Sequence, residues 1–349
     1  QLICKQKSQN KLPSWFNTKN IYYPSKVSLE QTSSETTAKY KASLISGKRL
    51  IDLTGGFGVD SFYFSSSFNN VVHCEKNTNL SEIAGHNFKQ LNKKNITCSD
   101  ENGIEYLKKS KEIFDVIYVD PSRRNDVKGK VFLLKDCEPN IPKFIDLLFN
   151  KTQTILIKNS PILDITSATN ELKFVKEIHI VAVNNDVKEL LYLLEKEFNG
   201  KITIKTVNFS KKNTEEFNFI ANNKSISNYQ EPLDYLYEPN AAILKSGGFH
   251  EITTQLDVYK IHQHSHLYTS KNNIKFPGRR FKILAVLPYD KKKIVKLLTN
   301  KKANITTRNF HKSVAQIRKE LKIKDGGEDY LFFTKNIHDK FSCIHCKKL

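Results

Sequence analysis

A glycine-rich stretch after a short apolar run is the first place where the residue types suggest chemistry. Leu50–Leu53 is typical of a buried strand, and three glycines follow it before a stretch with helical spacing. Glycine has no Cβ, so the backbone can take a strained turn and a ligand can approach it closely. We therefore expect a cofactor site here. Its predicted residues are Asp52, Thr54, Gly55, Gly56, Phe57 and Gly58.

Two carboxylates follow at the ends of the next two predicted strands. Glu75 comes directly after Val71–Cys74, where a carboxylate can accept hydrogen bonds from both hydroxyls of a cofactor ribose. Asp100 comes after a run at residues 95–99, and its carboxylate could accept from an adenine amino group. For Asp100 an ordinary turn residue is the alternative.

The end of the fourth predicted strand distinguishes between cofactors. Val116–Val119 runs directly into Asp120 and Pro121, at the sheet edge where α/β proteins bind ligands. Nicotinamide enzymes have no reason for an Asp-Pro-Ser-Arg-Arg sequence there. Methyltransferases that act on amino groups place an Asp-Pro turn at this position, beside the methyl group of S-adenosylmethionine (SAM). The sequence therefore predicts a SAM site with Asp120 and Pro121 at its catalytic centre.

The residues after Pro121 bear on the methyl acceptor. Asp120 would orient an amine, with most of the rate coming from positioning and electrostatics. Ser122 and Arg123 stand where the Asp-Pro-Pro-Tyr turn of base methyltransferases has a second proline and an aromatic ring. That difference weakens adenine N6 and cytosine N4 as targets, and the lack of a cysteine in this turn argues against cytosine C5. A nitrogen acceptor remains the preferred interpretation.

Three basic residues are candidates for substrate binding together with Ser122. Arg123 and Arg124 could hold a phosphate or a carboxylate through paired hydrogen bonds. The alternative is a structural pair that binds loop carbonyls or an acid such as Asp126. Lys158, near the end of the fifth predicted strand, would lie on the substrate side.

The elements that position these residues alternate between strands and helices. Strands are predicted at Leu50–Leu53, Val71–Cys74, Val116–Val119, Thr154–Ile157, Ile178–Val183 and Ile202–Val207, with helical spacing at Leu80–Leu91 and Val187–Phe198. This alternation predicts an α/β, Rossmann-like fold with a mainly parallel sheet. The polar segment Asn208–Gln230 is expected to hold the end of the last strand and a linker.

Three regions are predicted along the chain. Residues 1–46 form an aromatic, proline-containing arm and a helix over Ser28–Ile45, and residues 47–228 form the cofactor-binding domain. Residues 229–349 form a basic region that includes a small α+β domain. Its strand-like runs are Phe281–Leu287 and Tyr330–Thr334, and its helical runs are Lys291–Leu298 and Ser313–Leu321.

Charge gives an indication of the partner. The 349 residues carry a net charge of +20, and residues 229–349 hold 23 Lys/Arg against 11 Asp/Glu, or +12 of that total. Such a surplus favours binding to nucleic acid, although solvated surface lysines are the alternative.

No apolar run is long enough for a membrane span, and the six cysteines show no disulfide spacing, so a cytoplasmic protein with reduced thiols is expected.

Two further clusters do not change this interpretation. His262, His264 and His266 alternate along the chain, and Cys343 and Cys346 form a single C-x-x-C pair. Zinc requires more ligands than either cluster supplies with usable spacing. We expect both to be structural, and no metal is expected.

Taken together, these motifs resemble the bacterial class I SAM-dependent methyltransferases that carry a C-terminal THUMP-like domain. The resemblance covers most of the chain and is carried by Glu30–Glu35, Ala38–Ala42, Asp52–Asp60, Asp120–Asn125, Tyr237–Ile243, Phe276–Phe281 and Ile323–Gly327. It implies the fold and SAM as cofactor but no substrate. Because THUMP domains bind RNA, usually tRNA, the resemblance favours tRNA or rRNA.

Two alternatives to an RNA methyltransferase stay open. One is a methyltransferase for a protein or a small anionic molecule, whose carboxylate the two arginines would bind. The other is an RNA-binding protein that has lost its activity. The intact glycine turn, Glu75 and Asp120 argue against that loss.

Overall fold

The computed structural model describes residues 1–123, 133–223 and 225–349. Among the predicted site residues, Arg124 and the side chain of Arg123 lie outside the described residues. The chain forms two units, one of Gln1–Val183 with Val187–Ile204 and one of Asn184–Asp186 with Lys205–Leu349. The division after residue 228 stays a prediction, and the first unit ends earlier, at Ile204.

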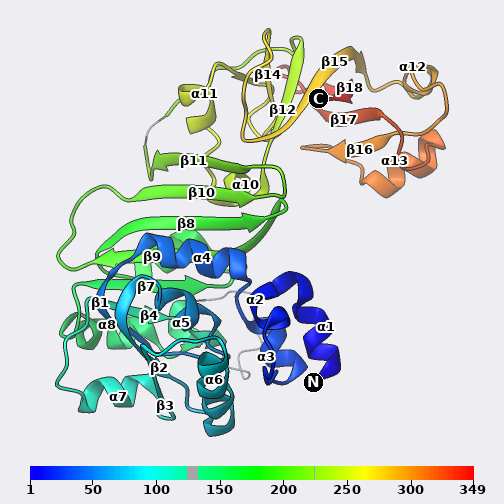
Figure 1. The fold of residues 1–349 in the computed structure, drawn as a ribbon. Helices are drawn as coiled ribbons and strands as arrows, with labels where there is room; N and C mark the ends of the chain where they lie inside the picture. Colours follow the sequence, from blue (N-terminus) through cyan, green and yellow to red (C-terminus); the bar gives the residue numbers. More distant parts are fainter. Residues whose placement is uncertain (124–132, 224) are drawn as a thin grey trace. The chain divides into compact units, whose positions relative to one another are not determined.

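A nine-stranded sheet contains the predicted strands (Figure 1). In chain order its strands are β1 (Gly47–Asp52), β2 (Phe68–Cys74), β3 (Ile96–Ser99), β4 (Val116–Val119), β7 (Thr154–Asn159), β8 (Val175–Val183), β9 (Asp186–Glu195), β10 (Thr203–Phe209) and β11 (Thr214–Ile220). They lie in the order β11-β10-β8-β9-β7-β4-β1-β2-β3.

Five of these strands form a parallel core that confirms the Rossmann-like fold class. β1 pairs in parallel with both β2 and β4, β2 with β3, and β4 with β7. All four residues of β4 are buried, as expected for a parallel strand that is covered on both faces. The strand order reverses between β1 and β4, and α/β sheets bind ligands beyond the carboxyl ends of their strands at such a point.

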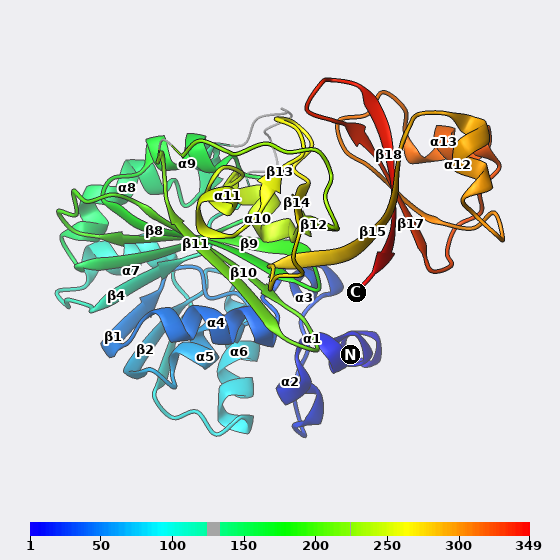
Figure 2. The ribbon, with the colours of Figure 1, turned by 90° about the horizontal axis from the view of Figure 1, so that it is seen from above.

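Helices cover both faces of this sheet (Figures 1 and 2). One face carries α4 (Glu35–Leu44), α5 (Val59–Phe64) and α6 (Thr78–Gln90), and the other carries α7 (Gly103–Lys109), α8 (Ile141–Phe149) and α9 (Ile165–Glu171). Five of the six begin at a Ser, Asn or Asp whose side chain accepts a hydrogen bond from a backbone N–H of the first turn. Each such cap contributes about 1 kcal/mol. Between β4 and α8 lie β5 (Ser122–Arg123), a 3₁₀ turn (Leu134–Asp136) and β6 (Cys137–Glu138).

The N-terminal arm packs against α5 and α6, as its aromatic residues predict. It contains α1 (Leu2–Lys11), α2 (Pro13–Asn17) and α3 (Lys26–Gln31). Trp15 is fully buried, and its ring lies 4.7 Å from that of Phe62 in α5. The Asn87 side chain in α6 accepts a hydrogen bond from the Tyr22 N–H and donates one to the Tyr22 carbonyl.

The prediction of one helix over Ser28–Ile45 is wrong, because the chain forms α3 and α4 with a break between them. Thr32 and Ser34 both have extended backbone. The Ser34 side chain accepts a hydrogen bond from the Thr37 N–H and so starts α4. A serine in this position favours a cap over a continuous helix.

The helix predicted at Val187–Phe198 is also wrong, because this segment is β9. The turn before it consists of Asn184 and Asn185 at φ 51° and 63°, the conformation of a two-residue hairpin turn. Leu190–Leu194 is buried at four of five positions. Its side chains alternate between the two faces of the strand, and both faces are covered by other parts of the protein. The predicted linker also contains a strand, β11, in which the buried Phe217 and Phe219 alternate with less buried positions.

The second unit contains a seven-stranded sheet with the order β13-β14-β12-β15-β18-β17-β16. Its strands are β12 (Tyr235–Pro239), β13 (Tyr259–Lys260), β14 (Tyr268–Ser270), β15 (Gly278–Pro288), β16 (Asn304–Thr307), β17 (Asp329–Lys335) and β18 (Phe341–Lys348). Its helices are α10 (Ala241–Ser246), α11 (Glu251–Gln255), α12 (Lys291–Lys296) and α13 (Val314–Leu321). The predicted strands at Phe281 and Tyr330 and the predicted helices at Lys291 and Ser313 are confirmed.

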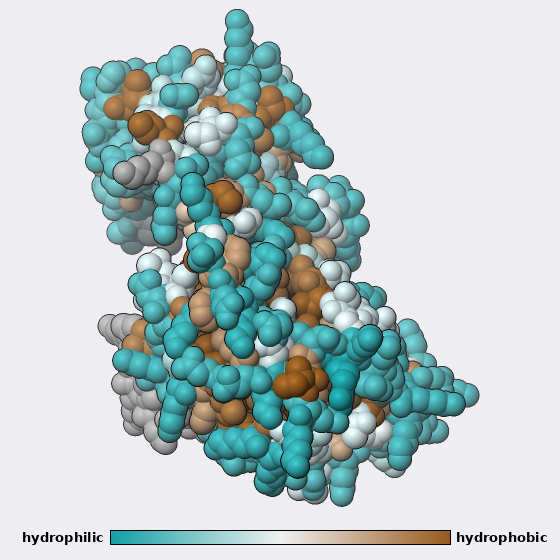
Figure 3. Space-filling view, turned by 90° about the vertical axis from the view of Figure 1, so that its left-hand side faces the viewer, coloured by the Kyte–Doolittle hydropathy of each residue, from teal (hydrophilic) through white to brown (hydrophobic). Residues whose placement is uncertain are grey.

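Hydrophilic side chains cover most of the face that Figure 3 shows, and hydrophobic residues form separate small patches there. Within the described ranges, no helix has the length and apolar character that a membrane crossing requires.

Candidate active site

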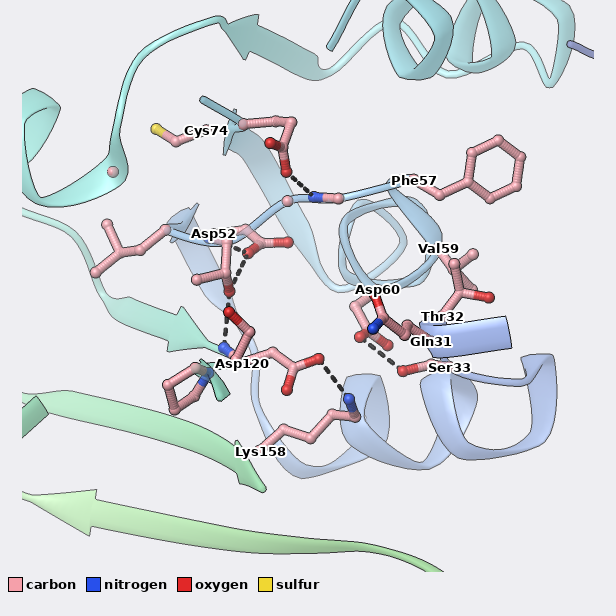
Figure 4. Close-up of a pocket in the computed structure, with 18 of the residues that line it drawn as sticks. Gln31, Thr32, Ser33, Asp52, Phe57, Val59, Asp60, Cys74, Asp120 and Lys158 are labelled. Carbon is pink, nitrogen blue, oxygen red and sulfur yellow. Dashed lines mark hydrogen bonds and ion pairs between the residues drawn. The ribbon is translucent and has the colours of Figure 1, made fainter. Parts of the chain in front are cut away.

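A cavity of about 700 Å³ opens at the carboxyl ends of β1, β2, β4 and β7. Its size is typical of a small-molecule site. Eleven predicted site residues line it: Asp52, Thr54, Gly55, Gly56, Phe57, Gly58, Glu75, Asp120, Pro121, Ser122 and Lys158. The arm adds Ser28, Gln31, Thr32 and Ser33 to the lining, and Figure 4 shows the last three.

The glycine turn is shaped by close packing beneath it. Gly56 and Gly58 have φ of +56° and +85°, which residues with a side chain adopt only with strain. A Cβ on Gly55 would lie 2.1 Å from the His73 ring, and one on Gly58 would lie 2.4 Å from the ring of Phe88. The turn therefore presses its main chain onto β2 and α6 and leaves its upper side to the cavity.

Glu75 lies in the cavity wall at the end of β2, as predicted. Its two carboxylate oxygens accept hydrogen bonds from the N–H groups of Gly56, at 2.9 Å, and Asn77, at 2.8 Å. These bonds tie β2 to the glycine turn and fix the carboxylate at the rim. Its hydrogen bonds to a cofactor ribose stay a prediction.

The predicted adenine-binding role of Asp100 is corrected by its position. β3 ends at Ser99 as expected, but Asp100 is exposed and lies in the wall of a second cavity with Lys89 and Lys93. Asn102 and Gly103 line the first cavity instead. α7 begins at Gly103 with Asn102 as its cap, so a shift of two residues decides which side chain faces the cavity.

Asp52 lines the cavity and also supports the turn through hydrogen bonds, while its predicted contact with a cofactor stays a prediction. One of its oxygens accepts a hydrogen bond from the Thr54 N–H at 3.0 Å, and the other accepts one from the Ser61 hydroxyl at 2.6 Å. Burial raises the pKa of Asp52 from 3.8 to about 7. The Ser61 hydroxyl also lies 3.0 Å from Nδ1 of His73, whose pKa burial lowers to about 4. This cluster supports the turn from below.

The raised pKa of Asp52 gives a testable dependence of stability on pH. The folded protein keeps the proton of Asp52 up to about pH 7, whereas the unfolded chain loses it near pH 4. Asp52 therefore stabilises the fold fully below about pH 4 and loses that contribution as the pH rises to 7. Relative to wild type, we expect the free energy of unfolding of Asp52→Asn to rise across this window, by up to about 1.4 kcal/mol per pH unit.

Urea unfolding of both proteins at several pH values between 4 and 8 checks this expectation. The quantity to compare is the difference in free energy of unfolding between the two proteins. His73 has a lowered pKa, so in both proteins it makes the free energy of unfolding rise between about pH 4 and 6.5, opposite to the effect of Asp52. A difference that stays constant with pH would contradict the assignment.

Asp120 and Lys158 form an ion pair in the cavity wall (Figure 4). The Asp120 N–H donates to Oγ1 of Thr54 at 2.7 Å, which joins the end of β4 to the glycine turn. The side chains are 32% and 14% exposed. Burial lowers the pKa of Lys158, but the carboxylates of Asp120, Glu189 and Asp60 outweigh it, so the pKa is raised above its ordinary value. Lys158 is therefore an ammonium that engages one Asp120 oxygen.

A second charged pair is buried behind this one. Lys41 of α4 is fully buried, and its Nζ lies 2.8 and 2.9 Å from the two carboxylate oxygens of Glu189 in β9. It also contacts the Ser33 hydroxyl at 3.0 Å and Asp60 at 3.2 Å. The other oxygen of Asp60 accepts hydrogen bonds from Ser33 and Tyr118. This network joins the arm, α5, β4 and β9 under the cavity.

Sequence reasoning missed Lys41, Asp60 and Glu189 as site residues. Lys41 and Asp60 fall inside motifs that carry the family resemblance, which was a usable signal. Glu189 fell within the segment assigned to a helix, and only the two-sided burial of β9 places its carboxylate inside the protein.

The remaining predicted candidates lie elsewhere. His262 contacts Asp339 at 3.1 Å and Asn309 at 3.0 Å. Cys343 and Cys346 are buried in β18, and burial raises the pKa of both thiols. Among the residues that the structure describes, no three His, Cys, Asp or Glu side chains are grouped to hold a metal.

Comparisons with known proteins agree with this geometry. A family model for a THUMP domain-like region matches residues 278–348, and one for a ferredoxin-like domain matches residues 235–277. An uncharacterized RNA methyltransferase from Mycoplasma mobile is 32% identical over 93 residues, which cover 26% of this chain and only 25% of that protein.

A solved structure matches almost the whole chain. The crystal structure of a candidate methyltransferase from Porphyromonas gingivalis W83 covers 99% of this chain and 88% of its own, with 31% identity and a TM-score of 0.89. A similarity of this extent covers residues of both units. The chain belongs to the family of class I SAM-dependent methyltransferases with a C-terminal THUMP-like domain.

Proposed function

We propose that this methyltransferase acts on RNA, with tRNA or rRNA as the substrate. The observation that carries the proposal is the match of residues 278–348 to a THUMP domain-like family in the most basic third of the chain. The partial similarity to an RNA methyltransferase supports the same substrate class. A cationic domain on the same chain as a SAM-dependent unit provides a means to bind a polyanionic substrate.

The cavity residues fit SAM. Within the turn, Gly55, Gly56 and Gly58 offer main chain without side chains, and a Cβ on Gly55 or Gly58 would collide with the protein beneath. Glu75 lies at the rim, where a ribose would be held. When bound, SAM supplies an electrophilic methyl group on a cationic sulfur. The chain's own part is to hold the acceptor near Asp120, exclude water and receive the acceptor's proton.

Part of the basic charge in the second unit is already engaged. Arg279 and Arg308 both pair with the buried carboxylate of Glu238, so these arginines stabilise the fold and have less capacity for phosphates. Lys292, Lys293, Lys301 and Lys302, in and after α12, are exposed. We therefore assign RNA contacts to these lysines first.

Two finer points belong to the same proposal. A substrate clamp made by Arg123 and Arg124 remains a prediction. The nitrogen acceptor favoured by the sequence is also untested, and the Lys158 ammonium beside Asp120 counts against it. We also propose that the protein works in the cytoplasm, where RNA is present and the six free cysteines stay reduced.

Mass spectrometry of nucleosides tests the proposal. Total RNA from cells that lack the gene should miss one methylated nucleoside that wild-type RNA contains. The purified full chain should restore it to that RNA in the presence of SAM. If RNA from the two strains is identical and labelled methyl groups instead appear in protein or small molecules, RNA is not the substrate.

The lysines around α12 give a second prediction. Changing Lys292, Lys293, Lys301 and Lys302 to Gln should weaken binding of bulk tRNA and flatten its salt dependence. The expected slope of log affinity against log salt falls by about 0.7 for each lost phosphate contact. Filter binding at several salt concentrations measures it. A matched variant with Lys94, Lys108, Lys143 and Lys173 of the first unit, all exposed, changed to Gln should keep the slope, and equal effects of both variants would refute the assignment.

A further inference from the structure

Four charged side chains from separate elements lie in the cavity wall or directly behind it. Asp120 follows β4, Lys158 is in β7, Lys41 is in α4 and Glu189 is in β9. Asp120 and Lys158 form the pair in the wall, and Lys41 and Glu189 form the pair behind it. Glu189 also raises the pKa of Lys158 through its charge, so the two pairs are coupled electrostatically.

Stability alone does not account for the inner pair. Lys41 is fully buried and the Glu189 side chain is 3% exposed, and taking such charges out of water costs several kcal/mol for each ion. Well-packed apolar side chains would stabilise the fold as well or better. Charges kept in this way at a ligand cavity are candidates for function.

The sign of charge at the cavity wall distinguishes between methyl acceptors. An amine nitrogen gains positive charge as it is methylated, and the adjacent Lys158 ammonium would oppose that charge. A hydroxyl oxygen becomes partly negative as it loses its proton and attacks, and an ammonium stabilises that charge. A carboxylate next to the ammonium can take the proton. The Asp120–Lys158 pair therefore suits an oxygen acceptor.

Within RNA, one hydroxyl recurs at every nucleotide. The ribose 2′-hydroxyl lies on the backbone, so it can reach a cavity without the base leaving its stack. Among the described lining residues, Phe57 is the one with an aromatic ring. It belongs to the glycine turn and is 2% exposed. In the described part of the wall near Asp120, no ring is present to stack on an extruded base.

We propose that the methyl acceptor is the ribose 2′-hydroxyl of RNA, and that Asp120 and Lys158 act on it directly while Lys41 and Glu189 are positioning residues. This inference rests on the proposed RNA substrate. The hydroxyl oxygen forms the new bond to the methyl carbon as its proton passes to the Asp120 carboxylate. The methyl–sulfur bond breaks and its electron pair stays on sulfur. Lys158 donates a hydrogen bond to the oxygen during the attack, and the charge of Glu189 adds to that of Asp120 in favouring the ammonium form of Lys158.

Product analysis tests the acceptor atom. The full chain is incubated with SAM and total RNA from cells that lack the gene, and the digested nucleosides are identified by mass spectrometry. A 2′-O-methylated nucleoside is expected, with the methyl group on the ribose fragment. A methyl group on the base fragment overturns this inference but leaves RNA as the substrate. If no RNA is methylated, the proposed function fails and the inference fails with it.

Ligand binding gives a readout that does not depend on activity. SAM carries a positive charge at sulfur and S-adenosylhomocysteine does not. The affinity for SAM divided by the affinity for S-adenosylhomocysteine therefore reports the protein's charge near the reacting end. Calorimetry should show this ratio rising several-fold in Lys158→Met and falling several-fold in Asp120→Asn. Glu189→Gln should lower the ratio by a smaller factor.

A matched control separates this effect from a structural one. Lys176→Met removes an exposed ion pair with Glu195 on β8 and β9, outside the cavity lining, and should leave the ratio unchanged. A merely structural role for Lys158 and Asp120 would weaken both ligands equally. Parallel losses of the two affinities in Lys158→Met and Asp120→Asn would therefore overturn the proposal.

Discussion

Asp120→Asn is expected to lower turnover about a thousandfold, while SAM affinity changes less than about tenfold. The amide keeps the shape of the side chain and can still contact Lys158. It cannot take a proton from the acceptor or balance the ammonium, and both losses are felt mainly in the transition state. Single-turnover rates on RNA from cells that lack the gene, together with calorimetry for SAM, separate the two effects.

The asparagine variant is more informative than alanine. Asp120→Ala would leave the partly buried Lys158 ammonium without a partner, and an uncompensated charge can destabilise a protein by several kcal/mol. Asp146→Asn in α8 provides the matched control, because Asp146 is 77% exposed and pairs with Lys173. It should keep wild-type turnover. Near-normal turnover of Asp120→Asn would show that Asp120 takes no part in the reaction.

Gly55→Ala is expected to abolish measurable SAM binding, a loss of more than about a hundredfold in affinity or about 3 kcal/mol. Its Cβ would lie 2.1 Å from the His73 ring, which is fully buried and packs on Phe88. His73 cannot move aside without disturbing β2. The turn must move instead, and it would rise into the space for the cofactor. Calorimetry with SAM measures the loss.

Gly85→Ala is the control for this change. Gly85 lies in α6, and a Cβ there would meet the Cys98 sulfur at an ordinary 3.5 Å. Alanine should keep SAM affinity and slightly raise the melting temperature, because alanine favours a helix over glycine by about 1 kcal/mol. If Gly55→Ala binds SAM as well as Gly85→Ala does, the turn does not form the cofactor site.

The parts of the site that could be predicted from the sequence are those where a local pattern requires a particular residue type. The glycines of the turn, Glu75 after β2 and Asp120 after β4 all depend on short buried strands followed by a polar residue. That pattern is local, because a run of four to seven apolar residues specifies both the strand and its end. The structure places all of these residues in one cavity.

The remaining parts depend on tertiary structure that a local pattern does not contain. The run Leu190–Leu194 is apolar at every position, which suits a helix or a strand until the neighbours on both faces are known. That ambiguity also concealed Glu189. Asp100 shows a different limit, because the fine position of a turn between β3 and α7 decides whether Asp100 or Asn102 faces the cavity.

The position of Lys41 has a consequence for how this enzyme can be divided. A fragment that starts at Gly47, the predicted domain boundary, would keep every strand of the first unit but would lose the cation that balances Glu189. It would also lose Ser33 from the cavity wall. The arm and the sheet therefore form one structural unit around the cavity. Any fusion or truncated version must retain residues 28–41 to keep both the Lys41–Glu189 ion pair and the cavity lining that the arm contributes.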